Sequence, residues 1–221
     1  MIDLFPRWEK SGMSHEMQEL ADGVAFWHGR RWPAGFHNSK YVKWAKQNPN
    51  GDFTLNWWHQ FLPILRVWKA TRPFSSAELA PRFTKSAAAL SSAWQAACLP
   101  WLEEDISTVT WDQVKAFPTE VAKIKPTKAA SPVFTSKFCH FLLPRVFPAV
   151  DNARLGSRWS TYEAYFGVVQ DEWGSTGTAT QADLVKELTR LIEAADEPVF
   201  SRFPMTNKIV ELRLMGRSHP R

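Results

Sequence analysis

The chain has 221 residues, of which 27 are Lys or Arg and 22 are Asp or Glu, giving a formal charge of +5. That length fits one domain or at most two small ones, and an apolar fraction of 44% is enough to build a core, which excludes wholesale disorder. No stretch approaches roughly 18 consecutive apolar residues, which excludes a transmembrane helix. The 12 Trp and 15 Phe are a heavy aromatic load for one domain.

Apolar residues recur mostly at spacings of three and four, which predicts helices and gives no sign of strands. Ser14 is followed by Glu16 and Glu19, the pattern of an N-cap with early acids, so a first helix is expected to run to about Gly29. Eight further helices are expected, near 38–48, 55–69, 86–98, 110–117, 136–143, 160–173, 181–195 and 207–215.

Prolines and glycines predict where several helices bend or end. Pro63 is expected to kink or split its helix, Pro100 and Pro118 to end theirs, and Gly216 to cap the last one. The chain has no repeat, low-complexity tract or long linker. The fold prediction is therefore all-α: one domain over residues 1–221, a compact bundle of nine or ten short helices, either as one body or as two lobes with a cleft between them.

Cysteine usage and the first residues predict the compartment. Cys98 and Cys139 are too few for a disulfide framework, and no CxxC pair is present. The N-terminal residues lack the basic and long apolar regions of a signal peptide. We therefore expect a cytoplasmic protein with reduced thiols and no contact with a membrane.

The charges are grouped along the chain. From Gly23 to Ser76 eight bases face one acid, Asp52, and from Val121 to Val150 five bases face none. Both blocks are rich in aromatic residues. Because Lys and Arg neutralise phosphates while rings stack on bases, this pattern predicts a nucleic-acid partner, and the alternative is a set of solvated helix faces.

The segment from Phe134 to Asn152 carries the most chemical information. A Thr-Ser pair begins a helix whose first turn contains Lys137, and the free N–H groups of a helix N-terminus suit a phosphate. Asp151 follows an apolar run and precedes a helix expected near Asn152. Because burial and helix N–H groups shift the pKa of such a carboxyl in opposite directions, Asp151 is a candidate for acid–base or electrostatic catalysis; the alternative is an ordinary N-cap.

The stretch SKFCHFLLPRVFPAVDNARL, residues 136–155, resembles the catalytic stretch of the helix-hairpin-helix DNA glycosylase superfamily. In that family a helix with a Lys in its first turn leads into a short apolar loop that ends in aliphatic-Asp-Thr/Asn, as in Val150-Asp151-Asn152. The resemblance implies a metal-free hydrolase that flips a base out of double-stranded DNA and leaves an abasic site.

The resemblance implies that Asp151 stabilises the sugar cation and orients or deprotonates the attacking water. Lys137 matches the Lys with which some members form a Schiff base, whereas contact with a backbone phosphate is its alternative role. Hydrolysis without strand cleavage is favoured. Expected DNA-backbone contacts are Lys123, Lys125, Lys128, Ser136 and Arg145.

A base-flipping enzyme also needs a wedge and an aromatic pocket. The expected residues for these roles are Asn56, Trp57, Trp58 and His59. A second aromatic-basic cluster is formed by Phe26, Trp27 and His28 together with Arg30, Arg31 and Trp32. Neighbours on a helix point about 100° apart, so Trp57 and Trp58 cannot both face one core stripe, and one is expected at a surface or cleft. The alternative is that both pack inside.

A Trp-rich pocket suits a bulky base, which leads to the hypothesis of a prokaryotic enzyme that acts against phage DNA containing modified, for example glucosylated, cytosine. The six His show no metal-ligand spacing, and no Gly-rich nucleotide motif is present, so neither a metal nor another cofactor is expected. A monomer is expected. The alternative function is a non-catalytic helical DNA-binding protein.

Overall fold

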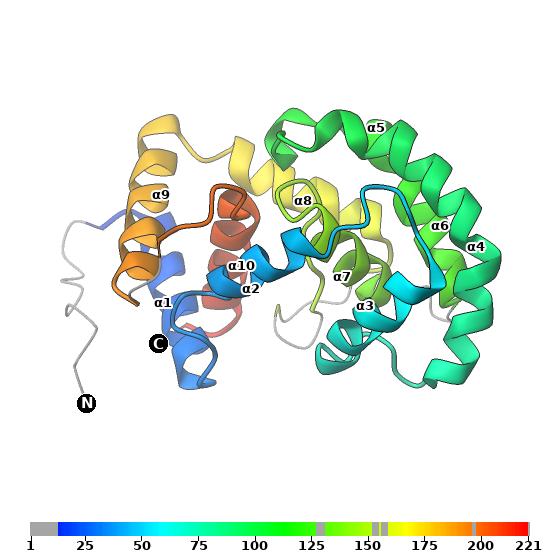
Figure 1. The fold of residues 1–221 in the computed structure, drawn as a ribbon. Helices are drawn as coiled ribbons and strands as arrows, with labels where there is room; N and C mark the ends of the chain where they lie inside the picture. Colours follow the sequence, from blue (N-terminus) through cyan, green and yellow to red (C-terminus); the bar gives the residue numbers. More distant parts are fainter. Residues whose placement is uncertain (1–12, 127–130, 152–154, 156–158, 196–197, 221) are drawn as a thin grey trace.

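In a computed structural model of the protein, residues 13–126, 131–151, 155, 159–195 and 198–220 are described. These residues form ten α-helices and two short 3-10 helices and contain no strand, which confirms the all-α prediction (Figure 1). The α-helices are α1 His15–Gly29, α2 Asn38–Lys46, α3 Leu55–Val67, α4 Ser76–Ala97, α5 Trp111–Val114, α6 Ala116–Ile124, α7 Val133–Leu142, α8 Tyr162–Gly174, α9 Thr178–Glu193 and α10 Met205–Ser218.

The helices group at two sides of an elongated molecule. Figure 1 shows α1, α9 and α10 together at one side, α4 to α6 at the other, and α2, α7 and α8 between them. The buried apolar side chains nevertheless form a single continuous cluster that runs through both groups. The described residues therefore share one hydrophobic core.

Glycine allows α1 and α10 to cross at very short range. A Cβ atom on Gly23 would lie 1.8 Å from the carbonyl oxygen of Leu212, and one on Gly216 would lie 1.9 Å from that of Glu19. Each helix thus offers a bare backbone to the other. The expectation that Gly216 caps the last helix is wrong, because α10 continues to Ser218 and Gly216 lies inside this crossing.

Two other expectations about helix ends are wrong, and in both the reason is the hydrogen bonding in the first turn of a helix. Pro118 does not end a helix, because it lies in the first turn of α6, where an N–H group would have no acceptor within the helix. The long helix α4 begins ten residues earlier than expected, at Ser76, where Ser75 and Glu78 form a capping box. Helix α3 runs through Pro63 without splitting.

Among the residues that the structure describes, no helix is both long enough and apolar enough to cross a membrane.

Candidate active site

Lys137 and Asp151 lie beside each other although 14 positions separate them. Lys137 is on α7, and its Nζ atom is 3.6 Å from Oδ2 of Asp151, which follows the loop after that helix. The same ammonium donates a hydrogen bond of 3.0 Å to the carbonyl oxygen of Trp68. The Lys137 side chain is only 5% exposed, whereas that of Asp151 is 26% exposed. The carboxylate is therefore the member of the pair that a ligand can reach.

Buried side chains from three helices hold the loop that carries Asp151. The Val150 N–H donates to Ser136 Oγ at 3.0 Å, and the Tyr162 hydroxyl donates to the Pro148 carbonyl at 2.9 Å. Asn207 Nδ2, on α10, donates to the Pro144 carbonyl at 2.7 Å and to that of Arg145 at 3.0 Å. A loop fixed at several backbone groups holds the carboxylate of Asp151 in one place.

Ser136 was expected to contact a DNA phosphate, and its position contradicts this. Its side chain is fully buried, and its hydroxyl accepts from the Val150 N–H while donating to the Val133 carbonyl. The reason is that α7 begins at Val133 rather than at Ser136, so Ser136 faces the core instead of the helix N-terminus.

A fourth buried tie to this loop comes from His140 on α7. Its Nδ1 atom is 2.7 Å from the Phe147 carbonyl, which only accepts, so Nδ1 carries the hydrogen. Its Nε2 then accepts from the Tyr41 hydroxyl at 2.7 Å. Burial, with a contribution from the Lys208 ammonium, lowers the pKa of His140 to about 3. His140 is therefore neutral at physiological pH and acts as a structural link between α2 and the loop.

Lys137 and Asp151 lie in an open pocket of about 450 Å³, a volume typical of ligand sites. Its other lining residues come from the turn after α1, the start of α2, the end of α3 and the start of α7; they are Arg31, Trp32, Pro33, His37, Lys40, Val67, Trp68, Lys69 and Val133. The indole rings of Trp32 and Trp68 supply aromatic walls. Three stretches of the sequence, 31–40, 67–69 and 133–151, thus build one pocket around the carboxylate.

The turns that bring these segments to the pocket contain unusual backbone conformations. Arg31, His37 and Lys69 all have positive φ angles, of 57°, 69° and 56°. Residues other than Gly rarely adopt such angles. Strained backbone conformations of this kind persist only where the surrounding structure holds them, and they are concentrated at functional sites. Three of the five such residues in the described part of the chain line this one pocket.

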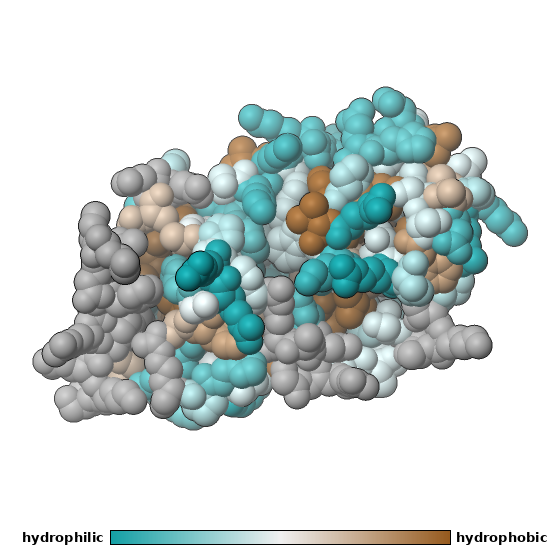
Figure 2. Space-filling model, turned by 90° about the horizontal axis from the view of Figure 1, so that it is seen from below, coloured by the Kyte–Doolittle hydropathy of each residue, from teal (hydrophilic) through white to brown (hydrophobic). Residues whose placement is uncertain are grey.

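The pocket is strongly cationic. Arg31, Lys40, Lys69 and Lys137 line it, against the single carboxylate of Asp151. The first three are exposed, so they stand at the rim and not at the floor. Helices α1 and α3 end at the lower edge of the molecule in Figure 1, and Figure 2 shows strongly hydrophilic side chains beside apolar ones on the face seen from below. Such a rim favours a polyanionic ligand.

The expected wedge at the start of α3 lies outside this pocket. Trp58 is fully buried and stacks on Phe83 with ring centroids 4.5 Å apart, and Trp57 is half-buried and donates from Nε1 to the Gln47 carbonyl. Asn56 and His59 are exposed, but neither lines the pocket. Trp58 packs in the core, whereas half-buried Trp57 packs against that core and is partly at the surface, so the two rings do differ in exposure as expected, but neither lines this pocket.

Within the second expected cluster, Arg31 and Trp32 line the pocket, whereas Trp27 and His28 lie behind its wall. Trp27 is buried, donates from Nε1 to the Pro33 carbonyl at 2.9 Å, and meets Trp32 edge-on with centroids 4.7 Å apart. His28 is half-buried and packs on Phe36. Trp27 therefore supports Trp32, the ring that lines the pocket, but contacts no ligand space itself.

The expected DNA contacts Lys123 and Lys125 lie at the end of α6 and just after it, before the start of α7. Exposed Lys123 pairs with Glu120 at 2.6 Å, and Lys125 is buried with its ammonium over the Phe74 and Phe134 rings. Desolvation lowers the pKa of Lys125. Both lysines line a separate groove with Pro132 and Thr135. Lys128, and Asn152 where a helix was expected to begin, lie outside the described residues.

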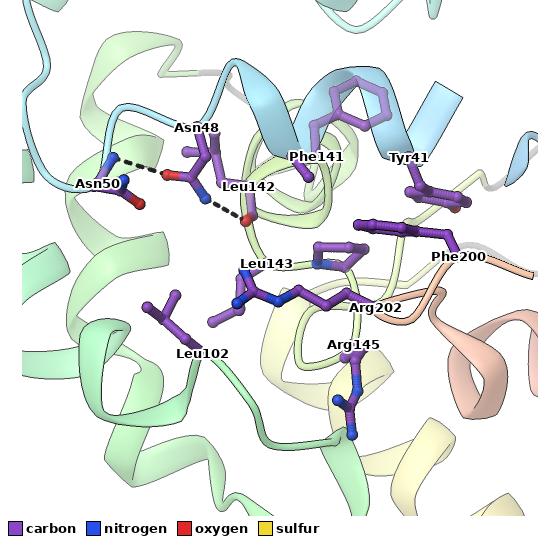
Figure 3. Close-up of a pocket in the computed structure, with 12 residues that line it drawn as sticks. Tyr41, Asn48, Asn50, Leu102, Phe141, Leu142, Leu143, Arg145, Phe200 and Arg202 are labelled. Carbon is purple, nitrogen blue, oxygen red and sulfur yellow. Dashed lines mark hydrogen bonds between the residues drawn. The ribbon is translucent and has the colours of Figure 1, made fainter. Parts of the chain in front are cut away.

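Arg145 lines a third, smaller pocket of about 130 Å³ between α2, the loop after α7 and residues 199–203. Figure 3 shows the side chains of Arg145 and Arg202 below the rings of Tyr41 and Phe200, with their guanidinium groups apart. Arg202 forms an ion pair with Glu103. This pocket does not include Lys137 or Asp151, so Arg145 is not in the candidate active site.

The described residues contain no group of three or more His, Cys, Asp or Glu side chains that could hold a metal ion. Comparisons of the chain with protein-family models, curated proteins and solved structures find no match. The functional argument therefore depends on the geometry of the pocket.

The sequence singled out the Lys137–Asp151 pair but missed most of the residues around it. Trp68, Lys69, Lys40 and His37 carried no motif. The one signal that could have found them is composition: the Gly23–Ser76 block combines almost acid-free sequence with six of the chain's Trp residues.

Proposed function

We propose that the protein is a DNA glycosylase, with Asp151 as its catalytic carboxylate. The observation that carries the proposal is the pair Lys137–Asp151, 3.6 Å apart, in a pocket with aromatic walls and a cationic rim. The helix pair α6–α7, followed by a loop that ends in Asp151, has the order that the resemblance to the helix-hairpin-helix glycosylases implies.

The chemistry asked of Asp151 is electrostatic. As the bond between base and sugar breaks, positive charge develops on the sugar, and a carboxylate held close to it stabilises that charge. The same carboxylate orients a water and accepts its proton as the new C–O bond forms. The buried ties to Val150 and Pro148 support this role, because a preorganised group loses little orientation freedom during the reaction.

Lys137 has a supporting role in this mechanism. A nucleophilic Lys needs a free lone pair and access to the sugar, whereas Lys137 is 5% exposed and its Nζ faces both the Asp151 carboxylate and the Trp68 carbonyl. The geometry therefore supports hydrolysis to an abasic site, without the Schiff base that would lead to strand cleavage.

The volume and the aromatic walls of the pocket indicate which kind of base it accommodates. An open volume of about 450 Å³ with two indole rings accommodates a base that carries an added group, since stacking tolerates varied substituents. We propose a modified base, such as a modified cytosine of phage DNA, as the substrate. Arg31, Lys40 and Lys69 would contact the phosphates next to the flipped nucleotide.

The decisive experiment is mass spectrometry of bases released from a panel of cellular and phage DNAs, including hydroxymethylated and glucosylated cytosine, with EDTA present. The wild type should release one base, and Asp151→Asn should bind the same DNA but release none. Asp52→Asn, which removes the exposed acid of the other basic block, is the matched control and should keep full activity. Salt-sensitive binding without release from any DNA would indicate a non-catalytic DNA-binding protein instead.

A further inference from the structure

One apolar side chain at the mouth of the pocket has an unusually large exposed fraction. Val67, the last residue of α3, is 75% exposed. The other large apolar side chains exposed in the described part of the chain, Leu55 and Leu99, are 45% and 42% exposed. Burial of Val67 against a partner would remove apolar surface from water and would therefore favour binding.

The backbone that presents Val67 is rigid. The Lys69 N–H donates to the Arg66 carbonyl at 2.9 Å, and the Ala70 N–H donates to the Leu65 carbonyl at 2.9 Å. Lys69 adopts a left-handed conformation, which turns the chain sharply after the helix. Val67 therefore stands on a closed, hydrogen-bonded corner and is held outward by it.

The corner is also tied to the candidate active site. Trp68, the next residue, lines the pocket with its ring and accepts from the Lys137 ammonium with its carbonyl. Val67 lines the mouth of the same pocket. A group that sits against Val67 is therefore next to the entrance through which a nucleotide would reach Asp151.

The charges around Val67 identify the partner that would cover it. Arg66, Lys69 and Arg72 are exposed, and the sequence has no acid from Phe53 to Ala77. An apolar tip surrounded by cations complements a polyanion with an apolar interior. Duplex DNA has this structure, because its phosphates lie outside a stack of bases, and proteins that deform DNA insert single apolar side chains between base steps.

We propose that Val67 is the wedge that enters the base stack at the position vacated by the flipped nucleotide. This inference rests on the proposed function and replaces the residues at the start of α3 that the sequence suggested. Extrusion of a nucleotide breaks its stacking contacts with both neighbours, and the Val67 methyl groups fill the gap. Trp68 then receives the nucleotide directly beside that gap.

The first test does not require the substrate to be known. The probe is a duplex in which 2-aminopurine lies next to a reduced abasic nucleotide, and its fluorescence rises when the neighbouring base loses its stacking contact. Wild-type protein should raise the fluorescence. Val67→Ala should reduce the affinity of the protein for the unstacked duplex about tenfold, because two methyl groups are no longer buried in the base stack. Leu55→Ala and Leu99→Ala remove exposed apolar side chains elsewhere and should behave as wild type.

The second test separates a wedge from a general effect on the protein. Val67→Ala should lower single-turnover base release from paired duplex about tenfold, but release from single-stranded DNA less than twofold, because a single strand has no stack to hold open. Because Val67 is exposed, the variant should keep the thermal stability of the wild type.

The outcomes for the wedge and for the enzyme are distinguishable. Absence of base release from every DNA contradicts the proposed function, while the fluorescence test still decides the role of Val67. The wedge is overturned if wild type and Val67→Ala unstack the probe equally, or if the wild type does not unstack it at all. Val67-dependent binding to anionic phospholipid vesicles without unstacking would also overturn it and assign the corner to a membrane surface.

Discussion

Mild acid should destabilise this protein through one residue, His140. The side chain is fully enclosed between α7, α2 and the loop that carries Asp151, and it is neutral because Nδ1–H donates to Phe147 while Nε2 accepts from Tyr41. Burial lowers the pKa of His140 from its ordinary 6.5 to about 3. Protonation of Nε2 would require the Tyr41 hydroxyl to accept instead of donate, and it would place a charge in the core.

The sign and size follow from proton binding. Between pH 6.5 and 3 the unfolded chain binds a proton at His140 and the folded chain does not, so the contribution of His140 to stability is complete above pH 6.5 and is lost as the pH falls toward 3. Each pH unit in this window costs about 1.4 kcal/mol. At pH 5, which is 1.5 units below 6.5, the loss is about 2 kcal/mol.

The assay is urea unfolding followed by Trp fluorescence at pH 7.5 and pH 5.0. His140→Gln keeps a donor and an acceptor but cannot titrate. Because the shorter amide does not reproduce both buried hydrogen bonds, the free energy of unfolding should fall by about 1–3 kcal/mol at pH 7.5. Between the two pH values the wild type should lose about 2 kcal/mol more than this variant. His59→Gln, at an exposed histidine on α3, should lose as much as the wild type. An equal loss in wild type and His140→Gln would refute the reasoning.

Two further predictions concern the helix crossing and the rim of the pocket. Gly23→Ala places a Cβ 1.8 Å from a backbone oxygen of α10 and should cost at least about 2 kcal/mol in thermal unfolding, whereas Gly29→Ala meets nothing within 4 Å and should be neutral or stabilising. Lys40→Ala and Lys69→Ala should each weaken duplex binding and reduce the slope of log K against log salt by about 1, with exposed Lys186→Ala on α9 unchanged; equal slopes for all three would place the DNA elsewhere.

Local patterns in the sequence predicted what local chemistry determines. The Ser14 cap and the end of α1 at Gly29 were correct, because N-cap chemistry and helical period depend on neighbouring residues. Lys137 and Asp151 were found together because one short stretch contains both. The misplaced start of α7 led directly to the wrong role for Ser136, whose hydroxyl reaches the core and not a phosphate.

The walls of the pocket could not be predicted in this way. Lys40, Trp68 and Lys69 line one pocket with Asp151 only because the start of α2 and the end of α3 meet there, and no short-range pattern specifies that meeting. Trp57 and Trp58 were expected to supply a wedge or base pocket, but Trp58 is buried and half-buried Trp57 packs against the core away from this pocket. Aromatic content predicted that stacking surfaces exist, but only the packing of helices determines which of them face solvent.

The hydrogen bonds from Asn207 have a consequence for the order in which the protein matures. Asn207 lies on α10, yet it secures the carbonyls of Pro144 and Arg145 in the loop that leads to Asp151. During synthesis the ribosome releases the pocket walls and Asp151 well before the segment that forms α10. A nascent chain thus contains every group of the pocket while its carboxylate loop still lacks one of its ties, and the geometry is completed only when α10 docks on α1.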